Sequence, residues 1–220
     1  PYNSFPNHEH DYVELTVILA GTGVHVVEGE EIPLSRGDIF FMPPGIRHGY
    51  GKLDRIKICD IMFKPSILQS VESSLAEIPG FHALFSLEPY FRKRGSFKNR
   101  MRLDPAETTS LEERICAMDV EYKKRLPGGK IMILQSFFLI LCELSRKFGS
   151  GKSDVPDPLK RIAKALSYLR LNYDKPFSLD KLADLSGLST AYFDRLFRQI
   201  FSKSPLQYAI GLKVQKSCSL

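Results

Sequence analysis

The stretch LDKLADLSGLSTAYFDRLFRQIFSKSPLQY, residues 179–208, predicts two short helices joined by a tight turn. Ala183 is small enough for two helices to press together, and Gly187, without a Cβ, suits a sharp turn between them. Ser178 and Ser189 each precede an apolar-periodic run, where side-chain caps of helices belong. This order predicts a helix-turn-helix. An ordinary amphipathic hairpin is the alternative, and the polar outer face of the second helix disfavours it.

The second helix of this hairpin predicts a DNA-reading surface. In units of this kind the second helix enters the major groove, and its first residues reach base edges. We expect DNA contacts from Ser189, Thr190, Ala191, Asp194, Arg195, Arg198 and Gln199. Arg195 lies near the helix start and is expected to meet bases, whereas Arg198 and Gln199 lie further along and are better placed for phosphates.

The charge of the chain is concentrated in the part that holds this hairpin. Residues 1–150 contain 19 Lys and Arg against 19 Asp and Glu, whereas residues 151–220 contain 12 against 6 and so carry the whole net charge of +6. A neutral body joined to a cationic end is typical of a regulator with a separate nucleic-acid-binding domain.

Length and cysteine usage indicate the class of protein. A chain of 220 residues fits two domains of roughly 100–150 and 60–70 residues. The cysteines show no paired spacing, which indicates reduced thiols in a cytoplasmic protein: Cys59, Cys116, Cys142 and Cys218. The most apolar run, residues 131–142, is too short to span a bilayer. No leader opens the chain, but it begins at Pro1, so we expect some N-terminal sequence to be missing.

Residues 12–63 predict β-structure. Runs rich in Val, Ile, Phe and Tyr alternate with turn residues, and we expect strands at 12–19, 23–28, 38–42 and 56–63. The segment Gly21-Thr22-Gly23 is expected to form a turn between the first two strands. Several short strands at close spacing predict a sandwich or barrel.

Two segments of this part resemble the paired cupin motifs, HxH-x3-E-x6-G and G-x5-PxG-x2-H. The first supplies His8, His10 and Glu14 and ends at Gly21; the second runs from Gly37 to His48. The sequence departs from the pattern after the second motif, where Lys52 replaces the usual asparagine.

The spacing of these residues predicts a polar cluster inside the barrel. Side chains alternate along a strand, so His8, His10, Tyr12 and Glu14 share one face, which His48 from a distant strand can join. Three histidines and a carboxylate are a set that holds Zn, Mn or Fe, and the strongest form of this interpretation is a metal-dependent oxygenase or isomerase. The alternative is that these groups bind an organic ligand or satisfy one another.

The middle of the chain predicts helices. We expect a helix over 66–78, broken by Pro79-Gly80, and a solvated surface at Arg92-Lys93-Arg94. Asp104, Pro105 and Glu107 predict an N-cap, a first helical residue and an acid at the third position. The helix that follows repeats apolar residues that we expect in a dimer interface: Leu111, Ile115, Met118 and Tyr122. A second helix over 130–148 is apolar nearly all round, so either the barrel or a second subunit must cover it.

The expected domain division follows from these elements. Residues 1–103 form a cupin-like barrel or jelly roll, 104–148 a helical pair for dimerisation, 149–158 a linker and 159–220 a helix-turn-helix domain that begins with a helix over 158–172. The fold class is α+β with two domains.

The whole chain resembles the AraC/XylS family of bacterial transcription regulators, in particular the branch of the rhamnose-responsive activators. The resemblance rests on FPNHEHDYVEL, RGDIFFMPPGIRHGY, MDVEYKKRLPGG, the long apolar helix and the hairpin. Within the hairpin it rests on Leu182-Ala183, Gly187, Ser189, Tyr192, Arg195, Phe197, Arg198, Ser204-Pro205 and Tyr208. Departures are Ser202, where a helix-ending glycine is usual, and Gly211 and Ser217 in the following helix.

The resemblance implies an effector-binding barrel, dimerising helices and two helix-turn-helix units joined by a long helix. The chain stops at Leu220 within that joining helix, so the second unit is absent from this sequence. Because family members commonly carry the HxH…E pattern without being known as metalloenzymes, the resemblance favours an organic ligand over a metal. Effector contacts are then expected from His8, His10, Tyr12, Glu14, Arg47 and His48.

Three functions are open on these residues: an effector-responsive DNA-binding regulator, a metal-binding cupin enzyme with a helical appendage, and a sensor fragment that acts only as a dimerisation partner. The hairpin and the charge favour the first, so we expect no enzymatic activity and no cofactor. The expected partners are double-stranded DNA, a sugar or small acid, a second copy of the chain and RNA polymerase, with no membrane contact.

Overall fold

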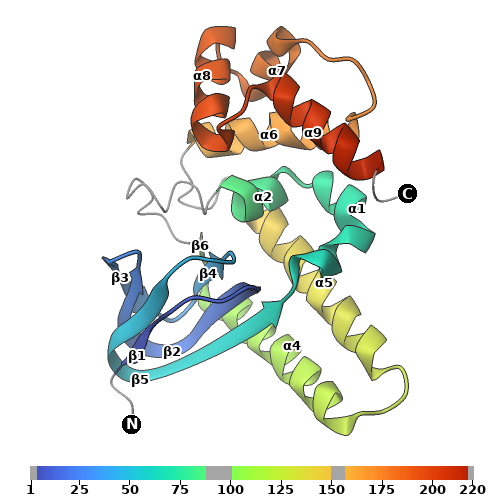
Figure 1. The fold of residues 1–220 in the computed structure, drawn as a ribbon. Helices are drawn as coiled ribbons and strands as arrows, with labels where there is room; N and C mark the ends of the chain where they lie inside the picture. The colour runs from blue at the N-terminus through green and yellow to red at the C-terminus, as the bar shows by residue number, and fades with distance from the viewer. Residues whose placement is uncertain (1–3, 88–100, 150–156, 218–220) are drawn as a thin grey trace. The chain divides into compact units, whose positions relative to one another are not determined.

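The computed structural model describes residues 4–87, 101–149 and 157–217 (Figure 1). Their contacts divide the chain into two compact units. The described residues up to Ile67 and those from Met101 to Leu144 form the first unit, and residues 68–87 and those from Ser145 onward form the second. The expected division placed residues 68–87 with the barrel, whereas their contacts are with the second unit.

The first unit contains an antiparallel sheet built around two long strands. The strands are β1 (Phe5–His8), β2 (Val13–Val27), β3 (Glu30–Ser35), β4 (Asp38–Met42), β5 (His48–Phe63) and β6 (Met101–Arg102). Their order is β1-β5-β2-β4-β6, with β3 paired to the far half of β2 (Figure 1). Its core contains Ile18, Val27, Leu34, Phe40, Met42, Ile46 and Tyr50. The expectation of an α+β fold with a cupin-like first domain is confirmed.

The expected turn at Gly21-Thr22-Gly23 is wrong, because β2 continues through it as one strand. The pairing of β2 with β5 shifts register at three places between Ile18 and Val24, and the two glycines lie within this irregular stretch of the strand. At Gly21 the backbone has φ +77°, and a Cβ there would lie 2.4 Å from the carbonyl oxygen of Arg55. Gly21 therefore permits a close approach of two strands rather than a chain reversal. Likewise β5 begins at His48 and not at Ile56.

The helical pair of the first unit forms as expected. Helix α4 (Pro105–Lys124) begins with a capping box in which the Glu107 amide donates to Asp104 Oδ1 at 2.9 Å and the Asp104 amide donates to Glu107 Oε2 at 2.8 Å. Helix α5 (Gly129–Gly149) follows after a short connection. The rings of Phe63 in β5 and Phe137 in α5 lie 4.8 Å apart, so α5 packs beside the end of β5.

The second unit contains a set of short helices in front of the hairpin. These are η1 (Pro65–Val71), which belongs to this unit from Leu68 onward, α1 (Glu72–Ala76), α2 (Pro79–His82) and η2 (Ala83–Leu87). The single helix expected over 66–78 is therefore wrong: a 3-10 turn and a short α-helix replace it, and Pro79 starts a helix instead of breaking one. The cationic run Arg92-Lys93-Arg94 lies outside the described residues.

The hairpin itself is confirmed in detail. Helix α6 (Asp157–Leu171) precedes α7 (Leu179–Ser186), α8 (Thr190–Phe201) and α9 (Pro205–Ser217). Gly187 ends α7 in the left-handed conformation with φ 59°. The linker expected over 149–158 falls mostly on residues outside the described ranges, and α6 begins at Asp157. Within the described ranges, none of the helices combines the length and apolar character needed to span a bilayer.

Candidate functional site

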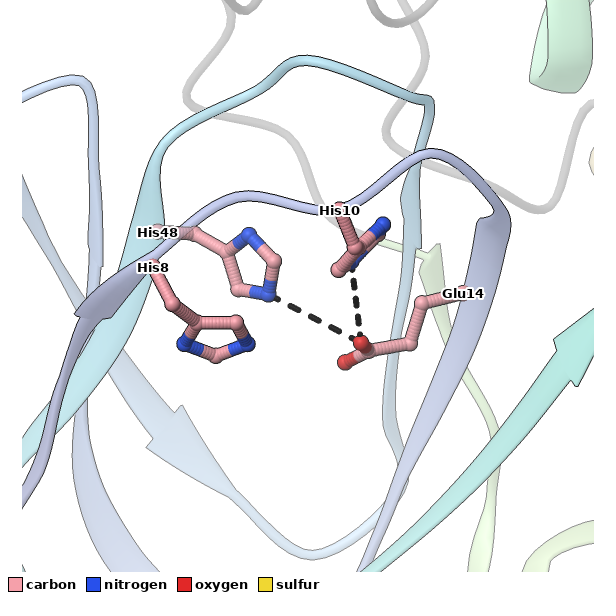
Figure 2. A group of neighbouring side chains, drawn as sticks. All are labelled: His8, His10, Glu14 and His48. Carbon is pink, nitrogen blue, oxygen red and sulfur yellow. Dashed lines mark ion pairs between the residues drawn. The ribbon is translucent and has the colours of Figure 1, made fainter.

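Three histidines and a glutamate, from three strands and the connection between β1 and β2, meet in the first unit (Figure 2). His8 ends β1 and lies opposite His48, the first residue of β5, across the antiparallel pair of these strands. His10 lies between β1 and β2, and Glu14 is the second residue of β2. One donor atom from each of the four lies within 4.8 Å of the other three. The four-residue cluster expected from the motif spacing therefore forms.

Main-chain carbonyls fix the orientation of all three imidazoles. The Nδ1 atoms of His8, His10 and His48 lie 3.1, 2.8 and 3.0 Å from the carbonyl oxygens of Pro6, Tyr12 and Ile46. Because a carbonyl oxygen only accepts, each Nδ1 carries a hydrogen and donates it. The Nε2 atoms of His10 and His48 are buried and lie 3.1 and 3.8 Å from Glu14 Oε2. The cluster thus presents imidazole nitrogens toward one carboxylate.

Glu14 is held as a carboxylate in a buried position. Burial by itself would raise its pKa, but the ion pair with His48, the hydrogen bond from Thr16 and the charges of the neighbouring imidazoles outweigh it and lower the pKa of Glu14 to about 2. For His48, burial acts to lower the pKa, and the ion pair with Glu14 and the hydrogen bond with the Ile46 carbonyl reverse this and raise it. The two residues therefore stabilise each other's charged forms.

A second carboxyl, that of Asp60, joins this group through Thr16. Thr16 Oγ1 lies 2.9 Å from Glu14 Oε1, 2.8 Å from Asp60 Oδ1 and 3.2 Å from the Tyr50 hydroxyl. One hydroxyl hydrogen serves only one of the two carboxylates. Partial desolvation of Asp60 and the negative charge of Glu14 raise the pKa of Asp60 to about 6, so Asp60 is the one that takes up a proton first.

A pocket of about 350 Å³ opens beside the cluster. Its walls come from β1, β2 and β5 and the residue Tyr12: Phe5, His8, Tyr12, Glu14, Tyr50, Ile56, Ile58, Asp60 and Met62. They combine aromatic rings, aliphatic side chains and two carboxyls, and none of these residues is a lysine or arginine. Such a mixture of apolar walls and a few polar groups is typical of a small-molecule site.

The residues expected at the effector site divide into three groups. His8, Tyr12 and Glu14 line the pocket, and His10 and His48 complete the cluster at its side. The Tyr12 ring also stacks on His10 with centroids 4.0 Å apart. Arg47 is exposed and is not among the lining residues; its backbone amide donates to Glu28 Oε1 at 3.0 Å.

His48 was expected from the sequence, but the residues of β5 that line the pocket were not. Ile56, Ile58, Asp60 and Met62 alternate along this strand, and Met62 and Asp60 lie opposite Glu14 and Thr16 of β2. The signal in the sequence was the carboxyl of Asp60 at an alternate position of an otherwise apolar strand face. It became informative only with the register, which places Asp60 on the face of Glu14.

The donor set and its orientation fit a divalent transition metal. Ligating histidines almost always donate their second ring nitrogen to a carbonyl or carboxylate, and all three histidines here do so through Nδ1. The buried Nε2 atoms of His10 and His48 lack a hydrogen-bond partner within the described part of the chain. His8, His10, Glu14 and His48 are therefore the residues that would hold such an ion.

The second unit carries the candidate nucleic-acid surface on α8. Ser178 and Ser189 accept hydrogen bonds from the backbone amides of Lys181 and Tyr192, at 3.1 and 3.4 Å, and so cap α7 and α8 as expected. Ala191, Arg195, Arg198 and Gln199 are exposed, and Thr190 and Asp194 are half-buried.

Contacts on α8 divide the expected DNA-contact residues by role. Arg198 Nε lies 2.7 Å from Asp194 Oδ2, and the Thr190 hydroxyl donates to Asp180 Oδ1 at 2.7 Å. These two contacts orient Arg198 and tie the start of α8 to α7. The guanidinium of Arg195 lies over the ring of Tyr192, 5.3 Å from its centroid, so Tyr192 also belongs to this surface.

The helices expected in a dimer interface expose apolar residues. Tyr122 is 68% exposed, Ile131 70% and Met132 56%, and all three lie on α4 or α5. Ile115 and Met118 are half-buried. Leu111, in contrast, is 6% exposed within the single chain and has little surface left for a partner.

Two family models match the chain. The AraC-like ligand binding domain matches residues 1–103, and the bacterial regulatory helix-turn-helix proteins of the AraC family match residues 169–208. The first match contains the whole histidine cluster and the pocket. The second contains the hairpin and its outward face.

Curated relatives match nearly the whole chain. The HTH-type transcriptional activator RhaR of Mannheimia succiniciproducens is 22% identical over 98% of this chain and 73% of its own length. RhaR of Escherichia coli strain K12 is 24% identical over 97% of this chain and 72% of its own. Among solved structures, an apo ToxT variant from Vibrio cholerae covers 96% of this chain and 93% of its own at 13% identity, with a TM-score of 0.43.

Proposed function

Because the chain belongs to the AraC family of bacterial transcription regulators, we propose that it is a sugar-responsive regulator whose effector binds in the pocket beside Glu14. As members with both domains do, it binds DNA through its helix-turn-helix and a small molecule through its N-terminal domain, and it is not an enzyme. A regulator of this kind acts on DNA in the cytoplasm, and the relatives' designation as activators supports contact with RNA polymerase.

The negative charge of the pocket is the observation that supports a sugar, and not a small acid, as the effector. Glu14 and Asp60 both face the pocket, and no lysine or arginine is among the described residues that line it. A carboxylate ligand would be repelled by Glu14, whose lowered pKa keeps it ionised at neutral pH. A neutral ligand rich in hydroxyl groups can donate hydrogen bonds to these carboxylate oxygens, which only accept. Of the two expected classes, sugar and small acid, this favours the sugar.

The pocket residues then have distinct roles. Glu14 and Asp60 accept hydrogen bonds from ligand hydroxyls, and the imidazole of His8 supplies a further polar edge. The rings of Phe5, Tyr12 and Tyr50 provide apolar faces for the carbon-bound hydrogens of a sugar ring. His10 and His48 hold the Glu14 carboxylate in place from behind.

A thermal-shift screen of neutral monosaccharides against the purified chain tests this proposal. A ligand at 100 times its dissociation constant adds about 2.7 kcal/mol to the stability of its unit. We expect at least one sugar to stabilise the wild type and to lose this effect in Glu14→Gln. The matched control is Glu112→Gln, which removes the same charge on α4, where Glu112 pairs with Lys57. Full stabilisation of Glu14→Gln would place the effector elsewhere.

A second candidate function adds a divalent metal to this site. The carbonyl-fixed histidines favour it, and such an ion would supply a Lewis-acidic position to which ligand hydroxyls coordinate. In that case His8, His10, Glu14 and His48 hold the ion and do not contact the sugar directly. Elemental analysis of protein purified without chelators decides between the two. About one equivalent of metal in the wild type, absent from His48→Ala, would show that the sugar binds through the metal and not directly to these side chains.

Dimerisation is proposed through α4 and α5. Tyr122, Ile131 and Met132 are exposed apolar residues of these helices that a second copy would cover, and Ile115 and Met118 of α4 are half-buried. Twofold pairing would bring two DNA-binding units together on one regulator.

A further inference from the structure

Residues 68–87 follow β5 in the sequence, but they contribute to the core of the other unit. Helix α2 and η2 pack on α6, and α1 contacts the same helix (Figure 1). Four large apolar side chains of the segment are buried there, each at most 6% exposed: Leu75, Phe81, Leu84 and Leu87. These residues fill space against α6 and are not a surface loop.

Helix α6 requires cover on more than one side. Its buried residues are Ile162, Ala163, Ala165, Leu166, Ser167 and Leu169. At about 100° per residue these positions spread over more than half of the helix circumference. Helix α7 packs on α6 from the hairpin side, and α2 and η2 provide additional cover. Without residues 68–87, part of this apolar surface would face water.

The fit of the segment is tightest at Gly80. A Cβ on Gly80 would lie 1.8 Å from the carbonyl oxygen of Ser145 and 2.7 Å from the amide nitrogen of Gly149. Both are backbone atoms in the last turn of α5, so a side chain at this position could be accommodated only by moving α2. The backbone of α2 therefore lies directly against the helix end that belongs to the same unit.

The segment is also the direct continuation of the strand that forms the candidate site. Strand β5 begins with His48 of the cluster, lines the pocket with Ile58 and Asp60, and ends at Phe63. Only Lys64 separates it from η1. Because a single residue joins the two, a movement of β5 also moves the start of the segment whose helices cover α6.

We propose that residues 68–87 are a docking arm: they lie in the ligand-binding half of the sequence and complete the core of the DNA-binding unit. The ability of α6–α8 to bind DNA then depends on the position of β5. The packing part of this proposal stands by itself, and the link to an effector rests on the function proposed above.

Hydrogen–deuterium exchange on the full chain, with a pair of glycine substitutions, tests the docking arm. Gly80→Ala adds one methyl group at the contact with Ser145. Gly211→Ala adds the same group in α9 of the same unit, where an added Cβ meets no atom within 4 Å. We expect Gly80→Ala to raise exchange in α2 and also in α6, α7 and α8, while β2 and β5 keep wild-type protection. Gly211→Ala should match the wild type throughout.

DNA affinity supplies the second readout, measured by fluorescence anisotropy with a labelled duplex of arbitrary sequence at low salt. We expect a loss of about tenfold or more for Gly80→Ala and none for Gly211→Ala. Wild-type exchange in α6–α8 together with wild-type affinity in Gly80→Ala would overturn the proposal. Should that variant fail to fold, Leu84→Ala removes buried contacts without adding an atom and must show the same pattern; normal exchange of α6 in Leu84→Ala would also overturn it. Neither readout uses a sugar, so failure of the pocket to bind one leaves this test intact.

Discussion

Asp194 and Arg198 form an ion pair on one face of α8, with Oδ2 of the aspartate 2.7 Å from Nε of the arginine. The two residues are four apart, so they are neighbours on the helix surface. The pair holds Arg198 in one orientation, while Arg195 lies over Tyr192. The two arginines of this helix are therefore prepared for different contacts.

We expect Arg195→Ala and Arg198→Ala to differ in their effect on DNA binding. Arg195 is placed for a base edge, so its loss should cost about 1–3 kcal/mol and relax selectivity at one position. Arg198 is placed for phosphate, so its loss should weaken all sequences alike and reduce the salt dependence by about one charge. Mobility-shift titrations at several salt concentrations measure both. Unchanged selectivity in Arg195→Ala would show that the reading face is assigned wrongly.

The buried imidazole of His82 predicts an acid-sensitive second unit. Burial, and secondarily the positive charge of Arg170, lower the pKa of His82 to about 3. Since the unfolded chain binds this proton near pH 6.5 and the folded chain does not, stability should be complete above that pH and fall as the pH decreases toward 3. At about pH 5 the loss amounts to about 2 kcal/mol.

The measurement is chemical unfolding of wild type and His82→Leu, followed by circular dichroism between about pH 5 and 7. Other groups that titrate in this range, such as Asp60, are common to both proteins, so the difference between them isolates His82. The difference in unfolding free energy between the two proteins should change with pH by the amount given above. A difference that is constant over this range would show that His82 is accessible to protons in the folded state.

The exposed apolar surface of α4 and α5 can be tested by charge. Ile131→Lys with Met132→Lys places two cations on residues that are 70% and 56% exposed, so the fold should tolerate them while a dimer should not. Leu206→Lys is the control, because Leu206 is 61% exposed on α9 of the other unit. Light scattering should report a monomer for the first variant and an unchanged mass for the second. A dimer that persists in the double variant would move the interface to another surface.

Ser202 offers a stabilising substitution. It ends α8 in the left-handed conformation with φ 54°, where a residue with a Cβ is strained. We expect Ser202→Gly to raise the stability of the second unit by about 0.5–1 kcal/mol. Thermal unfolding measures the change. Destabilisation would mean that the serine side chain contributes more than the strain costs.

Local signals made the helices predictable from the sequence. The caps at Ser178, Ser189 and Asp104 and the turn at Gly187 depend on residues within one or two helical turns, and all four are confirmed. The cluster of three histidines and Glu14 was accessible as well, because period-two alternation and a two-motif spacing define it.

Features that depend on distant partners were not predictable. From the sequence alone, Gly21 suggests a turn. Only its close approach to the backbone of Arg55 shows that β2 is one continuous strand with a bulge. Asp60 joins the site through the register of β5 against β2. The segment that contains Gly80 packs on α6, which lies far along the chain, and no local pattern announces such a partner.

The most direct test of the account is a calorimetric titration of the wild-type chain with a neutral aldose that stabilises it in the screen and, in parallel, with the uronic acid of the same sugar. The two ligands differ only where a carboxylate replaces a hydroxymethyl group. Because Glu14 is ionised and no lysine or arginine is among the described residues that line the pocket, the account predicts that the aldose binds and the acid binds at least about tenfold more weakly. Equal or tighter binding of the acid would contradict it.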